Sequence, residues 1–324
     1  MAAAAGVSAK TVSRVVNRES GVHPATQARV DAAIVTLGYR RNDVARNLRK
    51  GIASATIGLL IEDLGNPFYA IMARAVEQVA DRHGHAVTIT SSDEDPAREQ
   101  ERLTGLLRRG AGGLLIVPAS QDHRYLGDGL QRHTPIVFLD RPAVGIVADV
   151  VVLDNVGGAR QAVQHLIAQG HRRIGFVGDP LSVVTSAERL QGYREALGSA
   201  GLTVDEALIR TSPARADMSE VSTRVLMGLA VPPTALFAQN NRNCLGVLRA
   251  LRSLGVRPAL VGFDDFELAD MLADPVTVVG YDPGEIGRMG AELLFARMAG
   301  DRRPPQRIVL PTRLIARGSG ELRP

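Results

Sequence analysis

The sequence is poor in cysteine and in aromatic residues, and it lacks long apolar runs. Cys244 is the single cysteine among 324 residues, and aromatic residues make up 4% of the chain. One cysteine excludes an intramolecular disulfide and leaves too few thiolates for a cysteine-based metal site. The apolar runs at 57–61 and 113–117 have the length of a strand, whereas a membrane span needs about 20 residues. With no secretory signal visible after Met1, we expect a cytoplasmic protein without a membrane span.

The motifs of common enzyme active sites are missing as well. The sequence has no G-x-x-x-x-G-K-[ST] loop, no strand-linked G-x-G-x-x-G, no H-E-x-x-H and no G-x-S-x-G. His83 and His85 flank a helix stop without further ligands nearby, and Cys244 falls inside a helix, where a buried core position is expected. We therefore expect no catalytic residue, no cofactor and no metal site. An enzyme that uses Asp140 or Asp264 as an acid or base is the least favoured alternative.

The sequence does contain enough apolar residues for a large folded protein, and its charge is unevenly distributed. Hydrophobic residues make up 45% of the chain, and its length is more than one core usually fills, so two or more domains are expected. Residues 1–55 contain nine basic and three acidic side chains, a net charge of +6, so the rest of the chain must carry −2 of the total +4. A basic head on a weakly acidic body indicates binding to a polyanion; the alternative is a solvated basic terminus.

Short helices are predicted in the basic head. The first covers 8–17 and is capped by Ser8. Its apolar stripe is formed by Val12, Val15 and Val16. A second helix starts at Pro24 and ends before Gly38. Its inward stripe is formed by Val30, Ala33, Ile34 and Leu37.

The rest of the chain alternates strand-like and helix-like segments. The predicted strands lie at 56–61, 86–90, 113–117, 136–139, 150–153, 173–177, 234–238 and 259–262. The predicted helices lie at 68–83, 96–109, 158–169, 187–200 and 241–254. Repeated strand–helix units imply parallel sheets with right-handed crossovers, whose ligands bind beyond the carboxyl ends of the strands. The similar openings at 57–60 and 174–177 indicate two lobes with a cleft between them.

Residues 5–17, AGVSAKTVSRVVN, resemble the head of the lactose-repressor/galactose-repressor (LacI/GalR) family of bacterial transcriptional regulators. Further matches follow in the family's order at LGY 37–39, NPFY 66–69, LDRP 139–142, VLDN 152–155, GHRRI 170–174, ERLQGY 188–193 and VGFDD 261–265. The resemblance implies an α/β protein with a small all-α helix-turn-helix head and a two-lobed, periplasmic-binding-protein-like body with parallel sheets.

The same resemblance divides the chain into three parts. Residues 1–40 correspond to the DNA-binding head, 41–55 to a hinge helix and linker, and 56–324 to an effector-binding body. Within the body, the first lobe is expected at about 56–154 and 282–308, and the second at about 155–281 and 309–324.

The resemblance implies that the second helix of the head enters the major groove of DNA. Ala9, Lys10 and Arg14 match the family's base-reading positions, and the two basic side chains are suited to guanine O6 and N7. The residues placed for phosphate contacts are Ser8, Thr11, Ser13 and Asn17. Thr11 and Ser13 have the alternative of simply facing solvent.

The hinge helix is expected to contribute Asn42, Ala45 and Leu48. Leu48 matches the family's hinge leucine, an apolar wedge inserted between base steps in the minor groove. Without the resemblance, Leu48 would be interpreted as an ordinary core leucine.

An effector site in the cleft between the lobes is also implied. Its expected residues are Asn66, Phe68, Asp140, Arg189, Asn240, Asp264 and Tyr281. Carboxylates, amides and arginine bond hydroxyl groups and an aromatic ring covers an apolar ring face, so this set suits a sugar or a nucleoside. Two alternatives stay open, namely that Phe68 is core and that Asp140 forms a structural ion pair with Arg141.

Three features depart from the family's pattern. Only residues 1–5 precede Gly6, which shortens the first helix of the head to about one turn. We expect this to leave the valine stripe of the reading helix less covered, and it points to an upstream start codon. Asn240-Asn241 stands where the family usually has Asn-Asp, which weakens the case for a simple sugar. The connection at 255–258 is shorter than usual.

These observations favour an effector-responsive, sequence-specific DNA-binding transcriptional regulator. We expect a homodimeric repressor that binds double-stranded operator DNA and senses a small polar metabolite such as a sugar or a nucleoside. The alternative is a cytoplasmic small-molecule sensor that has lost DNA binding through its shortened head.

Overall fold

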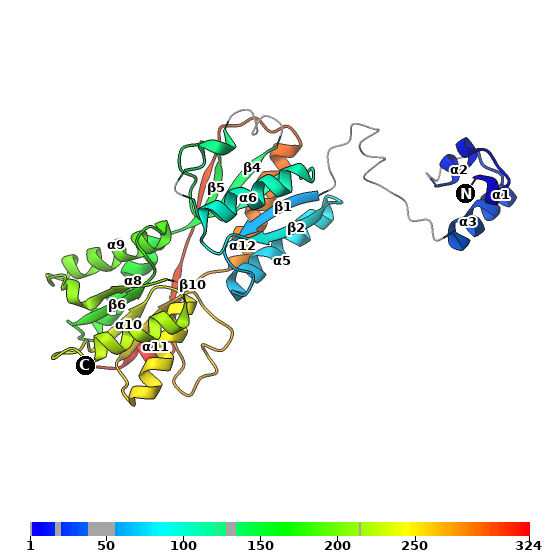
Figure 1. Cartoon of the computed structure of the whole chain (residues 1–324). Helices are drawn as coiled ribbons and strands as arrows, with labels where there is room; N and C mark the ends of the chain where they lie inside the picture. Colours follow the sequence, from blue (N-terminus) through cyan, green and yellow to red (C-terminus); the bar gives the residue numbers. More distant parts are fainter. Residues whose placement is uncertain (1, 17–20, 38–55, 121, 128–133, 214) are drawn as a thin grey trace. The chain divides into compact units, whose positions relative to one another are not determined.

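The computed structural model of the chain describes residues 2–16, 21–37, 56–120, 122–127, 134–213 and 215–324. They belong to two compact units, 1–55 and 56–324. The described part of the first unit is helical and is drawn in blue in Figure 1, whereas the described part of the second combines strands and helices. The predicted combination of an all-α head and an α/β body is confirmed.

Three helices form the described part of the head, namely α1 (Ala2–Ala5), α2 (Ala9–Val16) and α3 (Pro24–Thr36). Ser8 Oγ accepts a hydrogen bond from the backbone N–H of Thr11 at 3.1 Å, so Ser8 caps α2 as predicted. Pro24 occupies the first turn of α3, where its missing N–H would have no partner within the helix.

The head has a small apolar core of its own. Its buried members are Ala5, Val12, Val15, Val30 and Ala33. Arg29 of α3 donates from Nη2 to the carbonyl oxygens of Ala5 (2.6 Å) and Gly6 (2.9 Å) and so ties the end of α1 to α3. The valine stripe of α2 is therefore better covered than expected, since Val12 and Val15 are each only 7% exposed.

One predicted core position of the head is wrong. Leu37 was expected to continue the inward stripe of the second helix, but α3 ends at Thr36 and the Leu37 side chain is 52% exposed. The position after the last helical turn no longer follows the 3.6-residue period, so the stripe stops short of it.

Two six-stranded sheets, one per lobe, form the described part of the body (Figure 1). The first runs in the order β11 (Arg307–Leu310), β5 (Asp149–Leu153), β4 (Ile136–Asp140), β3 (Leu114–Ile116), β1 (Thr56–Ile61) and β2 (Ala86–Ser91). The second runs in the order β12 (Arg313–Ile315), β10 (Thr277–Gly280), β9 (Ala259–Phe263), β8 (Ala235–Ala238), β6 (Ile174–Gly178) and β7 (Ile209–Thr211). Neighbouring strands are parallel except β10 and β12.

Helices cover both faces of each sheet. They are α5 (Pro67–Arg82), α6 (Pro96–Arg108), α8 (Asn155–Ala168), α9 (Val184–Ser199), α10 (Ala216–Met227), α11 (Asn241–Leu254) and α12 (Pro283–Met298). Three short 3-10 turns accompany them at Arg124–Leu126, Glu206–Leu208 and Ser319–Glu321. In β1, Leu59 packs in the cluster that includes α5 and α12, while Leu60 packs in the cluster that includes α6. Burial on both faces explains why the strand is apolar throughout.

The chain passes between the lobes three times, after β5, after β10 and between β11 and β12. The lobe boundary expected near 308 falls inside β11, so residues 309 and 310 belong to the first sheet rather than to the second lobe. Helix α10 and strand β7 were not predicted, and nor were the elements after residue 263. Helices α8 and α9 each begin three residues earlier than expected.

Candidate functional site

Two aspartates lie at matching strand ends of the two sheets. Asp140 ends β4 and Asp264 directly follows β9, and both strands are third in their sheet orders. Their backbones have φ angles of 65° and 67°, in the left-handed region that aspartate tolerates better than most non-glycine residues. Both line the same cavity between the lobes. The strand ends therefore set two carboxylates at one site, one from each lobe.

That cavity, which we name the inner chamber, is the polar end of the cleft. It is lined by Asn66, Phe68, Asp140, Arg189, Asn240, Asp264 and Tyr281, together with Glu62, Tyr69, Arg141, Asp179, Thr185, Asn241 and Arg242. The structure thus brings together all seven residues expected in the effector site. Its volume is about 30 Å³, because side chains of the two lobes bond each other across it.

Arg189 is the central cation of the inner chamber. Its Nε donates to Asn155 Oδ1 at 2.9 Å and its Nη1 to the Gln239 carbonyl at 2.6 Å. Its Nη2 lies 3.6 Å from Asp264 Oδ1, and the guanidinium carbon lies 3.8 Å from the centre of the Phe263 ring. The side chain is 4% exposed, so these contacts hold it in one orientation facing the chamber.

Two aromatic side chains close one wall of the inner chamber. Tyr281 donates from its hydroxyl to Asp264 Oδ1 at 2.6 Å, and its ring lies 6.2 Å edge-on from that of Phe68. Phe68 also packs edge-on against Tyr69 with ring centres 4.7 Å apart and is 8% exposed. Phe68 therefore combines the two roles weighed from the sequence, since it belongs to the core and also lines the chamber.

The lobes are joined directly across the inner chamber. Asn241 donates from Nδ2 to Asn66 Oδ1 at 2.8 Å, and Arg242 forms an ion pair with Asp63. Asn241 also donates its backbone N–H to Asp264 Oδ2 at 3.3 Å, while its own Oδ1 has no hydrogen-bond partner among the described residues. The described body therefore represents a closed arrangement of the cleft that hydrogen bonds hold together.

Arg141 connects the inner chamber to a second cavity. Its Nη1 lies 2.6 Å from Glu94 Oε1 and donates to the Pro118 carbonyl at 3.1 Å, and its Nη2 donates to Glu62 Oε2 at 3.1 Å. The predicted ion pair with Asp140 is looser, with Nε 3.4 Å from Oδ2. Burial raises the pKa of Asp140, although Arg141 and Arg189 oppose that shift.

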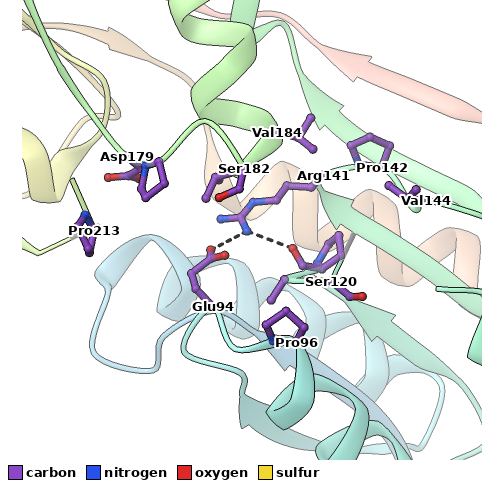
Figure 2. Close-up of a pocket in the computed structure, with 14 residues that line it drawn as sticks. Glu94, Pro96, Ser120, Arg141, Pro142, Val144, Asp179, Ser182, Val184 and Pro213 are labelled. Carbon is purple, nitrogen blue, oxygen red and sulfur yellow. Dashed lines mark hydrogen bonds and ion pairs between the residues drawn. The ribbon is translucent and has the colours of Figure 1, made fainter. Parts of the chain in front are cut away.

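The second cavity, which we name the outer chamber, has a volume of about 350 Å³ (Figure 2). It shares Arg141 and Asp179 with the inner chamber. Its other lining residues are Glu94, Pro96, Pro118, Ala119, Ser120, Pro142, Val144, Pro180, Ser182, Val183, Val184 and Pro213. Most of these are proline or aliphatic, so the outer chamber is a rigid apolar wall interrupted by three charged side chains.

Glu99 fixes the loop after β3, which forms one side of the outer chamber. Its Oε2 accepts hydrogen bonds from the backbone N–H groups of Ala119 (2.6 Å) and Ser120 (3.1 Å), and its Oε1 accepts from the Tyr125 hydroxyl (2.6 Å). Burial raises the pKa of Glu99, but hydrogen bonds from His123, Tyr125 and the backbone outweigh burial and hold the pKa below its ordinary value. Glu99 is therefore a buried carboxylate that positions the loop after β3.

The head presents part of α2 to solvent. Ser8, Ala9, Lys10 and Ser13 are exposed, and Thr11 and Arg14 are half-buried. The hydroxyl groups of Ser8 and Thr11 lie 2.9 Å apart in a hydrogen bond with each other. The remaining residues expected to contact DNA, Asn17, Asn42, Ala45 and Leu48, lie outside the described residues.

Sequence reasoning missed five residues of the inner chamber, namely Glu62, Tyr69, Asp179, Thr185 and Arg242. Glu62 and Asp179 follow strand ends, and Arg242 follows Asn241 at the start of α11, so each stands at the edge where ligands of parallel sheets bind. Their positions in the sequence, just after a predicted strand or at the start of a predicted helix, could therefore have identified these three residues as candidates for the site. Tyr69 and Thr185 lie in the first turns of α5 and α9. Tyr69 ends the NPFY motif at 66–69, which was a signal for it, whereas no motif marks Thr185.

Other features of the sequence have structural explanations. His83 stacks on Phe295 with ring centres 4.1 Å apart, and His85 meets the same ring edge-on at 5.0 Å. Cys244 is fully buried, and burial raises the pKa of its thiol to about 12. Among the described residues there is no group of three metal-ligating side chains, and none of their helices is long and apolar enough to cross a bilayer.

Comparison with known proteins identifies the chain's relatives. A family model described as bacterial regulatory proteins, lacI family, matches residues 1–42, and a periplasmic binding protein-like domain matches residues 163–320. The transcriptional regulator CelR of Thermobifida fusca is 36% identical over 333 residues, which cover 99% of this chain and 97% of CelR. The chain belongs to the lacI family. The resemblance inferred from the ordered motifs is thereby confirmed.

Other members of the lacI family match over similar lengths. The ribose operon repressor of Escherichia coli K12 is 31% identical over 321 residues, covering 97% of each chain. The lac repressor dimer bound to operator and the anti-inducer ONPF superposes with a TM-score of 0.82 at 28% identity, covering 98% of this chain and 97% of that one. A CelR–cellobiose complex gives 0.73 at 34%, covering 98% of each. This lacI-family protein is a DNA-binding transcriptional regulator.

Proposed function

We propose that this regulator is a cytoplasmic homodimeric repressor whose operator affinity is set by a small hydroxylated effector bound in the inner chamber. The observation that carries the proposal is the convergence of Asn66, Asp140, Arg189, Asp264 and Tyr281, from both lobes, on one polar cavity. Carboxylates, amides and a guanidinium at one site suit a ligand that is dense in hydroxyl groups. The relatives CelR, whose complex contains cellobiose, and the ribose operon repressor support this ligand class.

Occupation of the inner chamber is proposed to change the balance between open and closed lobes. In the closed arrangement Asn241 bonds Asn66 across the chamber, so a ligand there must replace this bond with its own hydroxyl contacts. Only a difference in ligand affinity between the two arrangements can alter DNA binding, and such coupling is typically about 1–3 kcal/mol. The proposal does not depend on whether the effector releases the operator or tightens binding to it.

Operator recognition is proposed to use the exposed face of α2. Lys10 and Ser13 are exposed on that face, and Arg14 stands next to them. The +6 charge of residues 1–55 supplies attraction to phosphates. A dimer would present two such helices to a palindromic site.

A dimer surface is proposed on helix α10 of the second lobe. Its buried face consists of Ser219, Ser222, Thr223 and Leu226. The exposed face carries Met218, Val221 and Val225, which are 37%, 56% and 46% exposed. A helix that buries hydroxyl groups and exposes aliphatic side chains is suited to a second apolar surface. The lac repressor dimer, which the chain resembles over almost its whole length, supports a two-fold assembly.

The proposed function is tested by screening sugars and nucleosides for a thermal shift of the full chain. Each stabilising compound is then added to an operator gel shift. We expect one class of compound both to raise the melting temperature and to change operator affinity, and Arg189→Ala to abolish both effects. A compound that binds in the chamber but leaves DNA binding of the full chain unchanged would instead support a sensor without operator control.

A further inference from the structure

The two chambers together carry more negative than positive side chains. Their combined lining includes five carboxylates, namely Glu62, Glu94, Asp140, Asp179 and Asp264. The same lining includes three guanidinium groups, namely Arg141, Arg189 and Arg242. Arg242 is itself paired with Asp63, which lies outside the lining. The cleft therefore holds several carboxylates that its own arginines do not neutralise.

Asp179 is the carboxylate of this set whose negative charge is least neutralised by nearby cations. It is 6% exposed, and its oxygens accept from neutral amides, at 2.6 Å from Asn240 Nδ2 and 2.9 Å from Asn243 Nδ2. It forms no ion pair with any described residue. Burial raises the pKa of Asp179 to about 6. An ionised carboxylate in such a place attracts a cation, because few water molecules are present to stabilise its charge.

Two other carboxylates of the lining are similarly placed. Asp140 is 5% exposed, and its carboxylate accepts no hydrogen bond from the described residues and makes only the 3.4 Å contact with Arg141 Nε. Glu94 faces the outer chamber, where it pairs with Arg141 (Figure 2), the one cation that contacts it among the described residues. Burial raises the pKa of Glu94 to about 7. Arg141 is therefore the shared cationic partner of three carboxylates, those of Glu62, Glu94 and Asp140.

One feature of the cleft, the N-terminus of helix α9, contributes positive charge. Helix α9 begins beside the outer chamber, and its N-cap residue, Val183, has no side chain that can cap it. A helix N-terminus carries about half a positive elementary charge. That partial charge is smaller than the surplus of carboxylates, so the cleft as a whole disfavours phosphate and carboxylate ligands.

We propose that the effector is a hydroxylated amine, such as an amino sugar, whose ammonium group lies between Asp179 and Glu94 at the outer chamber. Its hydroxyl groups then occupy the inner chamber against Asp140, Asp264 and Arg189. This inference rests on the proposed function and narrows its ligand class. A protonated amine supplies the missing positive charge and donates up to three hydrogen bonds, which suits acceptors whose burial makes an unpaired charge costly.

The experiment measures binding of matched compounds to the full chain by isothermal titration calorimetry at pH 7.5. Each set contains an amino sugar, its parent sugar and the parent's phosphate, for example glucosamine, glucose and glucose 6-phosphate, with galactose and mannose sets beside it. A disaccharide pair, chitobiosamine and cellobiose, probes the larger volume of the outer chamber. We expect the amine of at least one set to bind at least tenfold more tightly than its parent, and the phosphate to bind most weakly.

Two variants test where the amine is held. Asp179→Asn and Glu94→Gln should each reduce the preference for the amine over its parent sugar at least fivefold. Glu101→Gln, which removes an exposed carboxylate of α6 outside both chambers, is the matched control and should keep the full preference.

The outcomes separate this inference from the proposed function. If compounds bind but no set shows the tenfold preference for its amine, the amine inference is overturned and the hydroxylated-effector proposal stands. An amine preference that survives in both Asp179→Asn and Glu94→Gln overturns the assigned position. If no compound of any set binds, the proposed effector function fails together with the inference.

Discussion

At the scale of single residues, the chain places charged groups where their surroundings alter their chemistry. Arg189 and Arg141 are buried among carboxylates, and Asp140 and Asp264 hold strained backbone angles that direct them into the cleft. A buried charge without a full set of partners costs free energy of folding. Such groups are usually kept for binding rather than for stability.

The free-energy cost of burying the Asp179 carboxylate can be tested by measuring how the stability of the protein depends on pH. Burial raises its pKa from 3.8 to about 6, so the folded state binds the proton more tightly than the unfolded state. Ionised Asp179 therefore destabilises the folded state by about 3 kcal/mol above pH 6. This destabilisation is lost as the pH falls toward 4 and the carboxylate is protonated.

In Asp179→Asn that titration is removed. We expect the unfolding free energy of the variant, relative to that of the wild type, to rise by about 2 kcal/mol between pH 4 and pH 7.5, because about a fifth of the penalty is still present at pH 4. Urea denaturation of both proteins at several pH values measures this difference. A difference that stays constant with pH would show that Asp179 is not destabilised by its burial.

Arg14 provides the corresponding test in the head. Its position next to the exposed Lys10 and Ser13 on α2 is suited to a guanine edge in the major groove. Arg14→Ala should relax preference at one operator position by about 1–3 kcal/mol, as measured by binding to operators with single base changes. Ser13→Ala should weaken binding to all of these operators equally, because phosphate contacts do not distinguish bases. Unchanged base preference in Arg14→Ala would contradict the major-groove assignment.

At the scale of secondary-structure elements, α10 shows how a helix can escape sequence prediction. Met218, Val221 and Val225 lie on its exposed face, whereas its buried face contains three hydroxyl side chains and a single large apolar one, Leu226. The close approach of α10 and α11 requires Gly246, where a Cβ would collide with the carbonyl oxygen of Ala216 and lie 2.6 Å from the Cβ of Ser219. Small residues therefore replace an apolar stripe at this contact.

Gly246→Ala should separate α10 from α11 and destabilise the protein by about 1–3 kcal/mol. The added Cβ would collide with the carbonyl oxygen of Ala216, and a backbone atom cannot move aside without shifting its helix. Gly105→Ala in α6 is the matched control, since its Cβ would meet no atom within 4 Å. That control should gain up to about 1 kcal/mol from higher helix propensity. Thermal melts of both variants check the prediction. Equal effects of the two substitutions would contradict the tight contact.

The exposed face of α10 carries a second prediction. Val221→Glu places a charge on the proposed dimer surface and should raise the dimer dissociation constant at least tenfold, because an unpaired charge at an apolar contact is costly. Analytical ultracentrifugation measures this constant. Val231→Glu, at a residue that is 61% exposed outside α10, should leave it unchanged. A dimer that tolerates Val221→Glu as well as Val231→Glu must use another surface.

At the scale of the whole molecule, the two lobes of the body form a pair of similar sheets that share one cleft. Corresponding strands end in corresponding aspartates, and three connections between the lobes allow them to rotate about a common region. Side-chain contacts across the cleft, such as Asn241 with Asn66, hold the closed arrangement. A ligand that binds between the lobes can shift this balance without contacting the head.

Asp63 tests the balance between open and closed lobes without substitution of a residue that lines either chamber. It pairs with Arg242 across the cleft but lines neither chamber. Asp63→Asn keeps an oxygen for the backbone N–H of Gly65 and removes the ion pair, which is partly exposed and worth at most about 1 kcal/mol. We expect a larger radius of gyration without ligand in small-angle scattering, and up to fivefold weaker effector binding. An unchanged radius would show that this pair does not hold the cleft closed.

Much of this protein was determined by local sequence. Buried strands in the body are continuous apolar runs, and helices such as α5 carry a clear apolar stripe, so the alternation of strands and helices followed from periodicity. Ser8 and Pro24 marked helix starts because capping and proline geometry act within one turn. The ordered motifs then identified the family, and the resemblance to that family supplied seven residues of the inner chamber.

Only the tertiary structure decided which distant residues meet. The bond between Asn66 and Asn241, the shared role of Arg141 in both chambers and the surplus of carboxylates arise from strand order and from the approach of two lobes. Helix α10 and the crossing at β11 escaped prediction because their stability comes from packing against distant segments rather than from their own pattern. Propensity and capping act over a few residues, whereas a binding cleft depends on contacts between residues more than a hundred positions apart.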